Sequence, residues 1–270
     1  MLTTDYKEFS RLARDATLVP VVKSVPADLL TPVSAFLAIA SHEPDAFLLE
    51  SNERGEQIGR YTFLGARPYM QLQARGESVT LRRGKTDEKR SGSLIQVAKE
   101  LLRQHRPAVV PGFPPFTAGA VGYCGYDIVR QLENIGEHAK DDLSLPDCVL
   151  MFFDRMLAFD HLRHQIHIIA TADVSRENPR RAYDRAIDDI AILEKKLAAG
   201  LRAAHWLGAA RPKKGELKVR VGTSRERFLH TVEQAREYIA AGDIFQVVLS
   251  LRLELRPRLL PSTYTVLCAP

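Results

Sequence analysis

The sequence predicts an α+β fold with antiparallel β-sheets and peripheral helices. Segments with strand character occur in consecutive groups, helical segments lie outside those groups, and strands and helices do not alternate regularly as in a doubly wound sheet. The clearest strand pair runs from Val149 to Asp160, through a polar turn, and then from Ile166 to Ala172. We expect this pair to form an antiparallel hairpin with one face on the core.

Two helices are expected near the start of the chain. The first runs from about Asp5 to Ala16, and a proline-rich passage follows it. Thr31 is a suitable N-cap for the second helix, because Pro32 follows at the first helical position, where its missing N–H removes no hydrogen bond.

A group of strands comes next. Short β-branched or aromatic segments are separated by turn residues, and Gly76 and Glu77 form one such turn. The expected strands are Phe47 to Leu49, Arg60 to Leu64, Tyr69 to Arg75 and Ser78 to Arg83, and a helix follows from Leu94 to His105.

A last helix completes the first predicted domain, residues 1–200. Asn178 caps it, Pro179 occupies its first turn, and Gly200 is expected to end it. Its apolar face is formed by Ala186, Ile190, Leu193 and Leu197.

Residues 201–222 form a predicted basic connector without clean periodicity. Its Lys and Arg side chains lie among Gly and Pro residues, not on an aromatic-interleaved sheet or a recognition helix. The net charge of +5 could suggest nucleic-acid binding, but this context favours a solvated linker.

Residues 223–270 are predicted to be the start of a second domain. Thr223 and Glu226 have capping-box spacing before a helix that Gly242 closes. A strand is expected from Ile244 to Leu249, and one helix with one strand cannot bury a core, so this domain is predicted to be incomplete.

Gln246 interrupts that apolar strand. On a strand it shares a face with Val248 and Ser250, and a buried amide without a hydrogen-bond partner costs roughly 1–3 kcal/mol. Its partner is either another protein group, as is usual for buried polar atoms, or a ligand.

Composition narrows the class of protein. The 270 residues are 45% hydrophobic and 26% charged, no apolar run approaches the length of a membrane span, and the charged N-terminus is unlike a secretory signal. Cys124, Cys148 and Cys268 lack a paired motif, which favours reduced thiols in a cytoplasmic protein over disulfides or zinc. Three histidines at three-residue spacing from His161 to His167 do not converge as a tetrahedral metal site would require.

The glycines Gly119, Gly122 and Gly125 invite comparison with a phosphate-binding loop. No lysine–serine pair follows them, and no acidic residue lies at the distance that a dinucleotide fold requires. We expect them to let the backbone and the rings of Tyr123 and Tyr126 pack closely.

The segments AREYIAAGD and GDIFQVVLS, which overlap at Gly242 and Asp243, resemble the start of the chorismate-binding domain in the anthranilate synthase component I family. Four further segments resemble the N-terminal domain of that family in the same order. They are PADLLTPVSAFL at 25–36, FLLES at 47–51, GRYTFLGARP at 59–68 and GAVGYCGYDIVRQLE at 119–133. Together the segments cover most of residues 20–252.

The resemblance implies conversion of chorismate and ammonia to anthranilate and pyruvate in tryptophan biosynthesis. It implies a Mg²⁺ cofactor and a glutamine amidotransferase (glutaminase) subunit that supplies the ammonia. It also implies feedback inhibition by tryptophan, with Leu49, Glu50 and Ser51 in the effector pocket. From the residues alone, a polar turn after a strand is the favoured interpretation of Glu50 and Ser51, and the surrounding family motifs are what favour the effector pocket.

For Gln246 the resemblance implies a place on the active-site strand. Related isochorismate synthases, which add water, carry lysine at this position, and lysine can act as a general base where an amide cannot. Glutamine therefore fits ammonia as the nucleophile. The Mg²⁺ ligands and the acid and base residues of the family are expected beyond position 270.

The end of the chain departs from the family pattern. Leu251 and Arg252 replace the usual Gln-Arg, and the motif resemblance ends at Pro257. A frameshift shortly after Glu254 or a designed end are the two explanations, and either predicts a fragment without turnover. The alternatives for function are aminodeoxychorismate synthase component I and a non-catalytic tryptophan-binding or subunit-docking module.

Overall fold

The computed structural model describes residues 4–41, 43–50, 59–136, 141–203 and 219–255. The chain forms two compact units, residues 1–206 and 207–270. The boundary between them lies inside the stretch 201–222 that the sequence marks as a connector, most of which is outside the described residues. In the described part of the chain, no helix is both long enough and apolar enough to cross a membrane.

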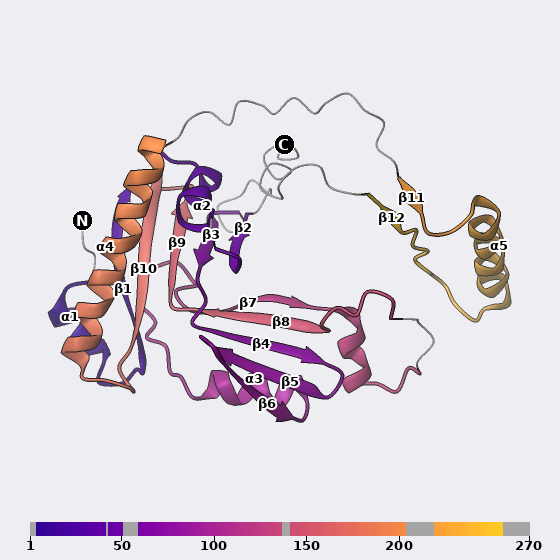
Figure 1. Cartoon of the computed structure of the whole chain (residues 1–270), viewed down its shortest axis with the longest axis horizontal. Helices are drawn as coiled ribbons and strands as arrows, with labels where there is room; N and C mark the ends of the chain where they lie inside the picture. Colours follow the sequence, from indigo (N-terminus) through magenta and orange to yellow (C-terminus); the bar gives the residue numbers. More distant parts are fainter. Residues whose placement is uncertain (1–3, 42, 51–58, 137–140, 204–218, 256–270) are drawn as a thin grey trace. The chain divides into compact units, whose positions relative to one another are not determined.

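The first unit contains two five-stranded antiparallel sheets, so the predicted α+β class is confirmed (Figure 1). Sheet A has the strand order β1-β10-β9-β3-β2, and sheet B has the order β6-β5-β4-β8-β7. The strands of sheet A are β1 Leu18–Pro26, β2 Ala46–Leu49, β3 Tyr61–Ala66, β9 Arg155–Asp160 and β10 Gln165–Asp173. The strands of sheet B are β4 Met70–Arg75, β5 Ser78–Arg83, β6 Thr86–Ser91, β7 Gly119–Cys124 and β8 Cys148–Phe153.

Among the described residues of the first unit, helices cover one face of sheet A and no helix covers the other face (Figure 1). The covering helices are α1 Tyr6–Leu12, α2 Pro32–Ala40 and α4 Pro179–Ala203. Directly opposed residues share a face of a sheet, so Leu64, Leu157 and Ile168 form one continuous row under these helices. All three side chains are fully buried in the main core. The opposite face therefore carries the residues that alternate with them.

The predicted start of α2 is confirmed, whereas the predicted end of α4 is wrong. The Thr31 hydroxyl accepts from the Ser34 N–H at 3.2 Å, and the Ser34 hydroxyl accepts from the Thr31 N–H at 2.9 Å. The helix α4 continues through Gly200 to Ala203. A Cβ on Gly200 would lie 2.3 Å from the Cβ of Ala38 in α2, so this glycine allows two helices to approach closely and does not stop one.

Helix α3 (Leu94–Arg103) covers one face of sheet B. Its buried residues Leu94, Val97 and Leu101 pack against β4, β5 and β8 in a second core. A short 3₁₀-helix, η1 (Tyr126–Gln131), follows the edge strand β7.

The predicted long strand from Val149 to Asp160 is wrong in one respect. It consists of two strands, β8 in sheet B and β9 in sheet A, separated by the single residue Asp154. Its hairpin with β10 is confirmed for β9 alone, and the expected one-sided core is also wrong, because β10 is buried on both faces from Ile166 to Ala172. The apolar pattern continues across Asp154, which is why the change of sheet leaves little trace in the sequence.

Three strands of the first unit were not predicted, and neither were β11 (Arg220–Val221) and β12 (Leu253–Glu254) of the second unit. β1 contains Pro20 and Pro26, which are compatible with its place at the edge of sheet A, where one side of the strand needs no ladder partner. β6 has the sequence TDEKRS, without apolar alternation, and pairs only with β5 at an edge of sheet B. β7 contains glycines, which weaken the strand signal.

The second unit contains β11 (Arg220–Val221), α5 (Arg225–Ala241) and β12 (Leu253–Glu254). Ser224 caps α5, because its hydroxyl accepts from the Arg227 N–H at 3.3 Å, so the predicted cap at Thr223 is wrong by one residue. Gly242 ends the helix in the left-handed region at φ 83°, as predicted.

The predicted strand from Ile244 to Leu249 is wrong. Among the described residues of this unit the paired strands are β11 and β12, and the 244–249 segment has no strand beside it. Phe245 is 95% exposed and Val248 is 83% exposed, and Gln246 is exposed as well. A strand needs a neighbour to satisfy its backbone, so the apolar pattern alone does not make one here.

Candidate functional site

The LLES motif lies at the end of β2, an edge strand of sheet A. Leu49 is the last residue of β2 and is 48% exposed, and Glu50 follows it at the surface. Ser51, the third predicted effector residue, lies outside the described residues. The structure therefore places two of the three residues side by side at one corner of the sheet.

Leu49 belongs to a row of side chains that crosses all five strands on the helix-free face. From β2 to β1 the directly opposed residues are Leu49, Phe63, Ala158, His167 and Ser24. The small Ala158 separates the rings of Phe63 and His167. Phe116 packs edge-on against Phe63 with ring centroids 5.7 Å apart. The end of the row beside Leu49 is thus an apolar, aromatic surface with a carboxylate next to it.

A charged pair borders this surface. Arg60 donates to Asp160 from Nη2 at 2.6 Å and from Nε at 3.2 Å, and its guanidinium lies 4.8 Å from the ring centroid of Tyr61. Backbone N–H groups of Leu162 and Arg163 each donate to the same carboxylate at 3.1 Å.

The environment of Asp160 determines its ionisation. Burial alone would raise the pKa of this carboxyl, but the hydrogen bonds from Arg60 and from the turn backbone outweigh burial and hold the pKa below its usual value. Asp160 is therefore a fixed anion that anchors Arg60 and the β9–β10 turn.

His167 lies near the middle of the same face. Its Nδ1 is 2.8 Å from the Ser24 hydroxyl, and its Nε2 is buried with no hydrogen-bond partner among the described residues. Burial lowers the pKa of His167, so the ring favours the neutral form. A neutral ring fits the apolar surroundings provided by Ala158 and Phe63.

The glycine segment forms strand β7 and not a ligand loop. A Cβ on Gly122 would lie 1.8 Å from the Val149 carbonyl oxygen of β8, and a Cβ on Gly125 would lie 3.2 Å from that of Asp147. The expectation of close backbone packing is confirmed at Gly122 and Gly125, whereas the expected close packing of the tyrosine rings is wrong for Tyr126, which is 85% exposed. Tyr123 donates from its hydroxyl to the Pro146 carbonyl at 2.9 Å, which ties the strand further to this segment.

The histidines between β9 and β10 have separate structural surroundings. Nε2 of His161 is 2.8 Å from the Thr62 hydroxyl, whereas His164 has φ 51° at the turn. Within the described ranges, no three His, Cys, Asp or Glu side chains are grouped as a metal site would require.

In the second unit, Gln246 is exposed and lies outside a strand. The premise that it interrupts a buried strand is therefore wrong for this chain. Its family role stays a prediction.

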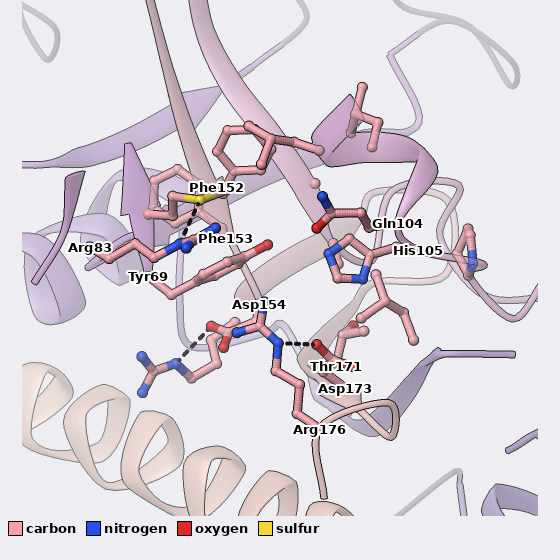
Figure 2. A pocket seen from close by; sticks show the side chains of 18 of the residues that line it. Tyr69, Arg83, Gln104, His105, Phe152, Phe153, Asp154, Thr171, Asp173 and Arg176 are labelled. Atoms are coloured by element: carbon pink, nitrogen blue, oxygen red, sulfur yellow. Dashed lines mark hydrogen bonds and ion pairs between the residues drawn. The ribbon is translucent and has the colours of Figure 1, made fainter. Parts of the chain in front are cut away.

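A cavity of about 610 Å³ lies where the chain crosses from β8 to β9 at Asp154 (Figure 2). In Figure 2 the hydroxyl of Tyr69 points toward the side of the cavity that carries Gln104 and His105. Burial raises the pKa of Asp154, although the neighbouring Arg155 opposes this effect. The ion pairs along the wall are Arg155 with Asp154 and Asp189, Arg176 with Asp173, and Arg185 with Glu177. Arg83 also lines the cavity, so four arginines balance the four carboxylates, and the wall has the character of a structural network.

Sequence reasoning missed the cavity and the Arg60–Asp160 pair. The two partners of the pair are 100 positions apart. Arg60 lies in the GRYTFLGARP motif, but that motif carries no signal for its partner. The antiparallel pairing of β3 with β9, which sets Tyr61 opposite Asp160, is what brings them together.

Comparison with known proteins assigns the family. The model of the chorismate binding enzyme family matches residues 44–267. The chain belongs to this family. The resemblance was expected to end at Pro257, and that end point is wrong because the family match continues to residue 267.

Two curated relatives carry the same name. The chain is 36% identical over 249 residues to "Anthranilate synthase component 1" of Acetivibrio thermocellus, covering 91% of this chain and 50% of the relative. It is 37% identical over 262 residues to the protein of that name from Synechocystis sp., and the match covers 94% of this chain and 51% of that relative. The chain thus spans about half the length of these curated relatives.

A solved structure supports the fold. The crystal structure of anthranilate synthase component I from Streptococcus pneumoniae TIGR4 matches with a TM-score of 0.55 and 24% identity, covering 89% of this chain and 50% of that one. At this identity the likeness applies to the fold alone. It agrees with the arrangement of antiparallel sheets and helices described above.

Proposed function

We propose that this chain is the N-terminal part of an anthranilate synthase component I. The whole protein would be a lyase that aminates the chorismate ring with loss of the allylic hydroxyl, and then eliminates pyruvate to leave anthranilate. Its ammonia would come from a glutamine amidotransferase subunit, and the cytoplasm is the compartment that its unpaired thiols favour. The observation that carries the proposal is the match of more than nine-tenths of this chain to relatives of that name.

Aminodeoxychorismate synthase component I, the alternative that stops before pyruvate loss, is less well supported. The two relatives described above carry the name anthranilate synthase component 1. The product distinguishes the two proposals directly, because only anthranilate synthesis releases pyruvate.

We assign the helix-free face of sheet A near Leu49 and Glu50 to tryptophan as inhibitor. Leu49 and Phe63 offer an apolar surface for an indole ring, and the Glu50 carboxylate can accept from an α-ammonium group. Ser51 would add a hydroxyl that donates or accepts. Binding at such a distance from the chemistry would act by favouring one of two domain arrangements.

The chemistry itself is assigned to parts beyond position 270. The family resemblance implies Mg²⁺, and we assign its ligands to the part of the relatives that corresponds to positions beyond 270. Gln246 is proposed for the active-site strand of the complete protein, where a neutral amide would not activate water. The chain alone is therefore expected to form no anthranilate.

A chimera tests this proposal. Residues 1–250 of this chain are joined to the C-terminal half of the Acetivibrio thermocellus relative, and anthranilate fluorescence and pyruvate release are followed with chorismate, ammonium and Mg²⁺. We expect both products from the chimera, neither product from the chain alone, and inhibition by L-tryptophan. A folded chimera that forms neither product would contradict the proposal.

The effector assignment is tested in the same chimera. Glu50→Ala should raise the tryptophan concentration needed for half-inhibition, measured against the uninhibited rate of the same variant. Glu77→Ala, which removes an exposed carboxylate from the β4–β5 turn, is the matched control and should leave inhibition unchanged. Equal inhibition of the Glu50→Ala variant and the control would contradict the assignment.

A further inference from the structure

Two cysteines face one another at the edge of sheet B. Cys124 is the last residue of β7 and Cys148 is the first residue of β8, and the two are directly opposed in the register. Their Sγ atoms are 3.3 Å apart, and both are free thiols. β7 is the outer strand of the sheet, so this contact joins the edge to its neighbour.

The backbone hydrogen bonds beside the two cysteines determine how close their Cα atoms lie. The Gly125 N–H donates to the Asp147 carbonyl at 2.7 Å, joining the residue after Cys124 to the residue before Cys148. This bond places the cysteines in a non-hydrogen-bonded pair, where opposed Cα atoms are about 4.5 Å apart and side chains are closest. A disulfide spans Cα separations of roughly 4.4–6.8 Å, so it fits here without movement of either strand.

The two thiols have different surroundings. Cys148 is fully buried in the core under α3, whereas Cys124 is exposed at the edge. We propose that Cys124 and Cys148 are a redox-active pair, which a small-molecule disulfide oxidant converts to a reversible cross-strand disulfide.

The order of events follows from exposure. Cys124, as the accessible thiol, attacks the oxidant and forms a mixed disulfide, releasing one small thiol. Cys148 then attacks the Cys124 sulfur, and its proton leaves with the second small thiol. Two protein thiols are thereby oxidised to one disulfide, and one oxidant disulfide is reduced to two thiols.

Electrostatics agrees with this order. Burial, and then contact with Cys124, raise the pKa of Cys148 to about 12, so Cys148 keeps its proton while Cys124 is free. When Cys124 is modified, its thiol no longer contributes to the raised pKa of Cys148. The closed disulfide would tie the end of β7 to β8 immediately before η1, and a thiol reductant would reopen it.

Glutathione disulfide is the probe for the test, applied to the full chain in which Cys268→Ser removes the third thiol. Intact mass should fall by two hydrogen atoms, peptide mapping should find Cys124 joined to Cys148, and dithiothreitol should reverse the change. Adding Cys148→Ser or Cys148→Ala should instead leave one glutathione attached to Cys124.

A displaced thiol supplies the matched control. Cys148→Ser with Leu150→Cys moves the inner thiol two residues along β8, to a diagonal position at about 7–8 Å that a disulfide does not reach. This variant should also retain glutathione on Cys124. The proposal is overturned if the Cys268→Ser chain itself ends with glutathione on Cys124 and a free Cys148 thiol, or if both thiols stay unmodified at equilibrium.

Discussion

Replacing Asp160 by alanine tests how the border of the helix-free face is held. The Asp160 side chain is fully buried and accepts four hydrogen bonds, two from Arg60 and two from the backbone of the following turn. Alanine would leave all four donors without this acceptor. Loss of one partner of a buried pair costs about 3–5 kcal/mol, but Arg60 is 24% exposed and water can reach it, so we expect a loss of about 2–3 kcal/mol.

The pair Arg82–Asp87 is a matched control. It has the same two-point geometry, with Arg82 Nε and Nη2 donating at 2.8 and 2.9 Å, but both side chains are about half exposed. Exposed pairs contribute little to stability, so Asp87→Ala should unfold at nearly the same urea concentration as the parent chain. Urea unfolding followed by far-ultraviolet circular dichroism compares the two variants.

The pH dependence of the Asp160 effect has a definite sign. The folded-state pKa of Asp160 lies below its unfolded value, so the stabilisation is present above the unfolded pKa of about 3.9 and is lost as pH falls through the lower folded value. The difference in stability between the parent and Asp160→Ala chains should therefore begin to shrink as pH falls below about 4. Equal destabilisation by Asp160→Ala and Asp87→Ala at neutral pH would refute the reasoning.

Three further predictions concern other parts of the chain. Gly122→Ala should lower the free energy of unfolding by at least about 2 kcal/mol, because its new Cβ meets a backbone carbonyl. Gly84→Ala, whose Cβ would meet open space, should lower it by only about 1 kcal/mol because of the positive φ of Gly84. Urea titrations that find Gly84→Ala the more destabilising variant would contradict this. Burial lowers the pKa of His167, so the unfolded chain binds more protons and stability should fall as pH drops below about 6.5, a slope that His167→Gln should flatten in thermal unfolding across that range. Replacing Phe245 and Val248 by serine should reduce self-association in sedimentation velocity, since both side chains are exposed; a parent chain that is already monodisperse would count against this.

Local signals were sufficient for part of the fold. The cap at Thr31 and the turn at Gly76 depend on residues a few positions apart, and both are where the sequence predicts them. The division at Asp154 was missed because apolar residues continue on both sides of it, and the choice between two sheets depends on partners distant in the chain. The Ile244 to Leu249 segment shows the opposite error, in which a strand-like pattern has no neighbouring strand among the described residues.

The candidate effector site could also be predicted from the sequence only in part. Leu49 and Glu50 came from the motif, and β2 does end where the motif predicts. The row that joins Leu49 to Phe63 and His167 depends on the strand order of sheet A, which no short segment contains. The Cys124–Cys148 contact has the same origin, because it arises from the register of two strands that are separated by η1 and its flanking loops.

Calorimetric titration of the chain with L-tryptophan tests the central claim most directly. We expect saturable binding at one site, weakened at least about tenfold by Glu50→Ala through loss of a charged hydrogen bond, and unchanged by Glu77→Ala. No binding by the parent chain, or equal binding by the parent and Glu50→Ala chains, would contradict the assignment of this corner of sheet A to the effector.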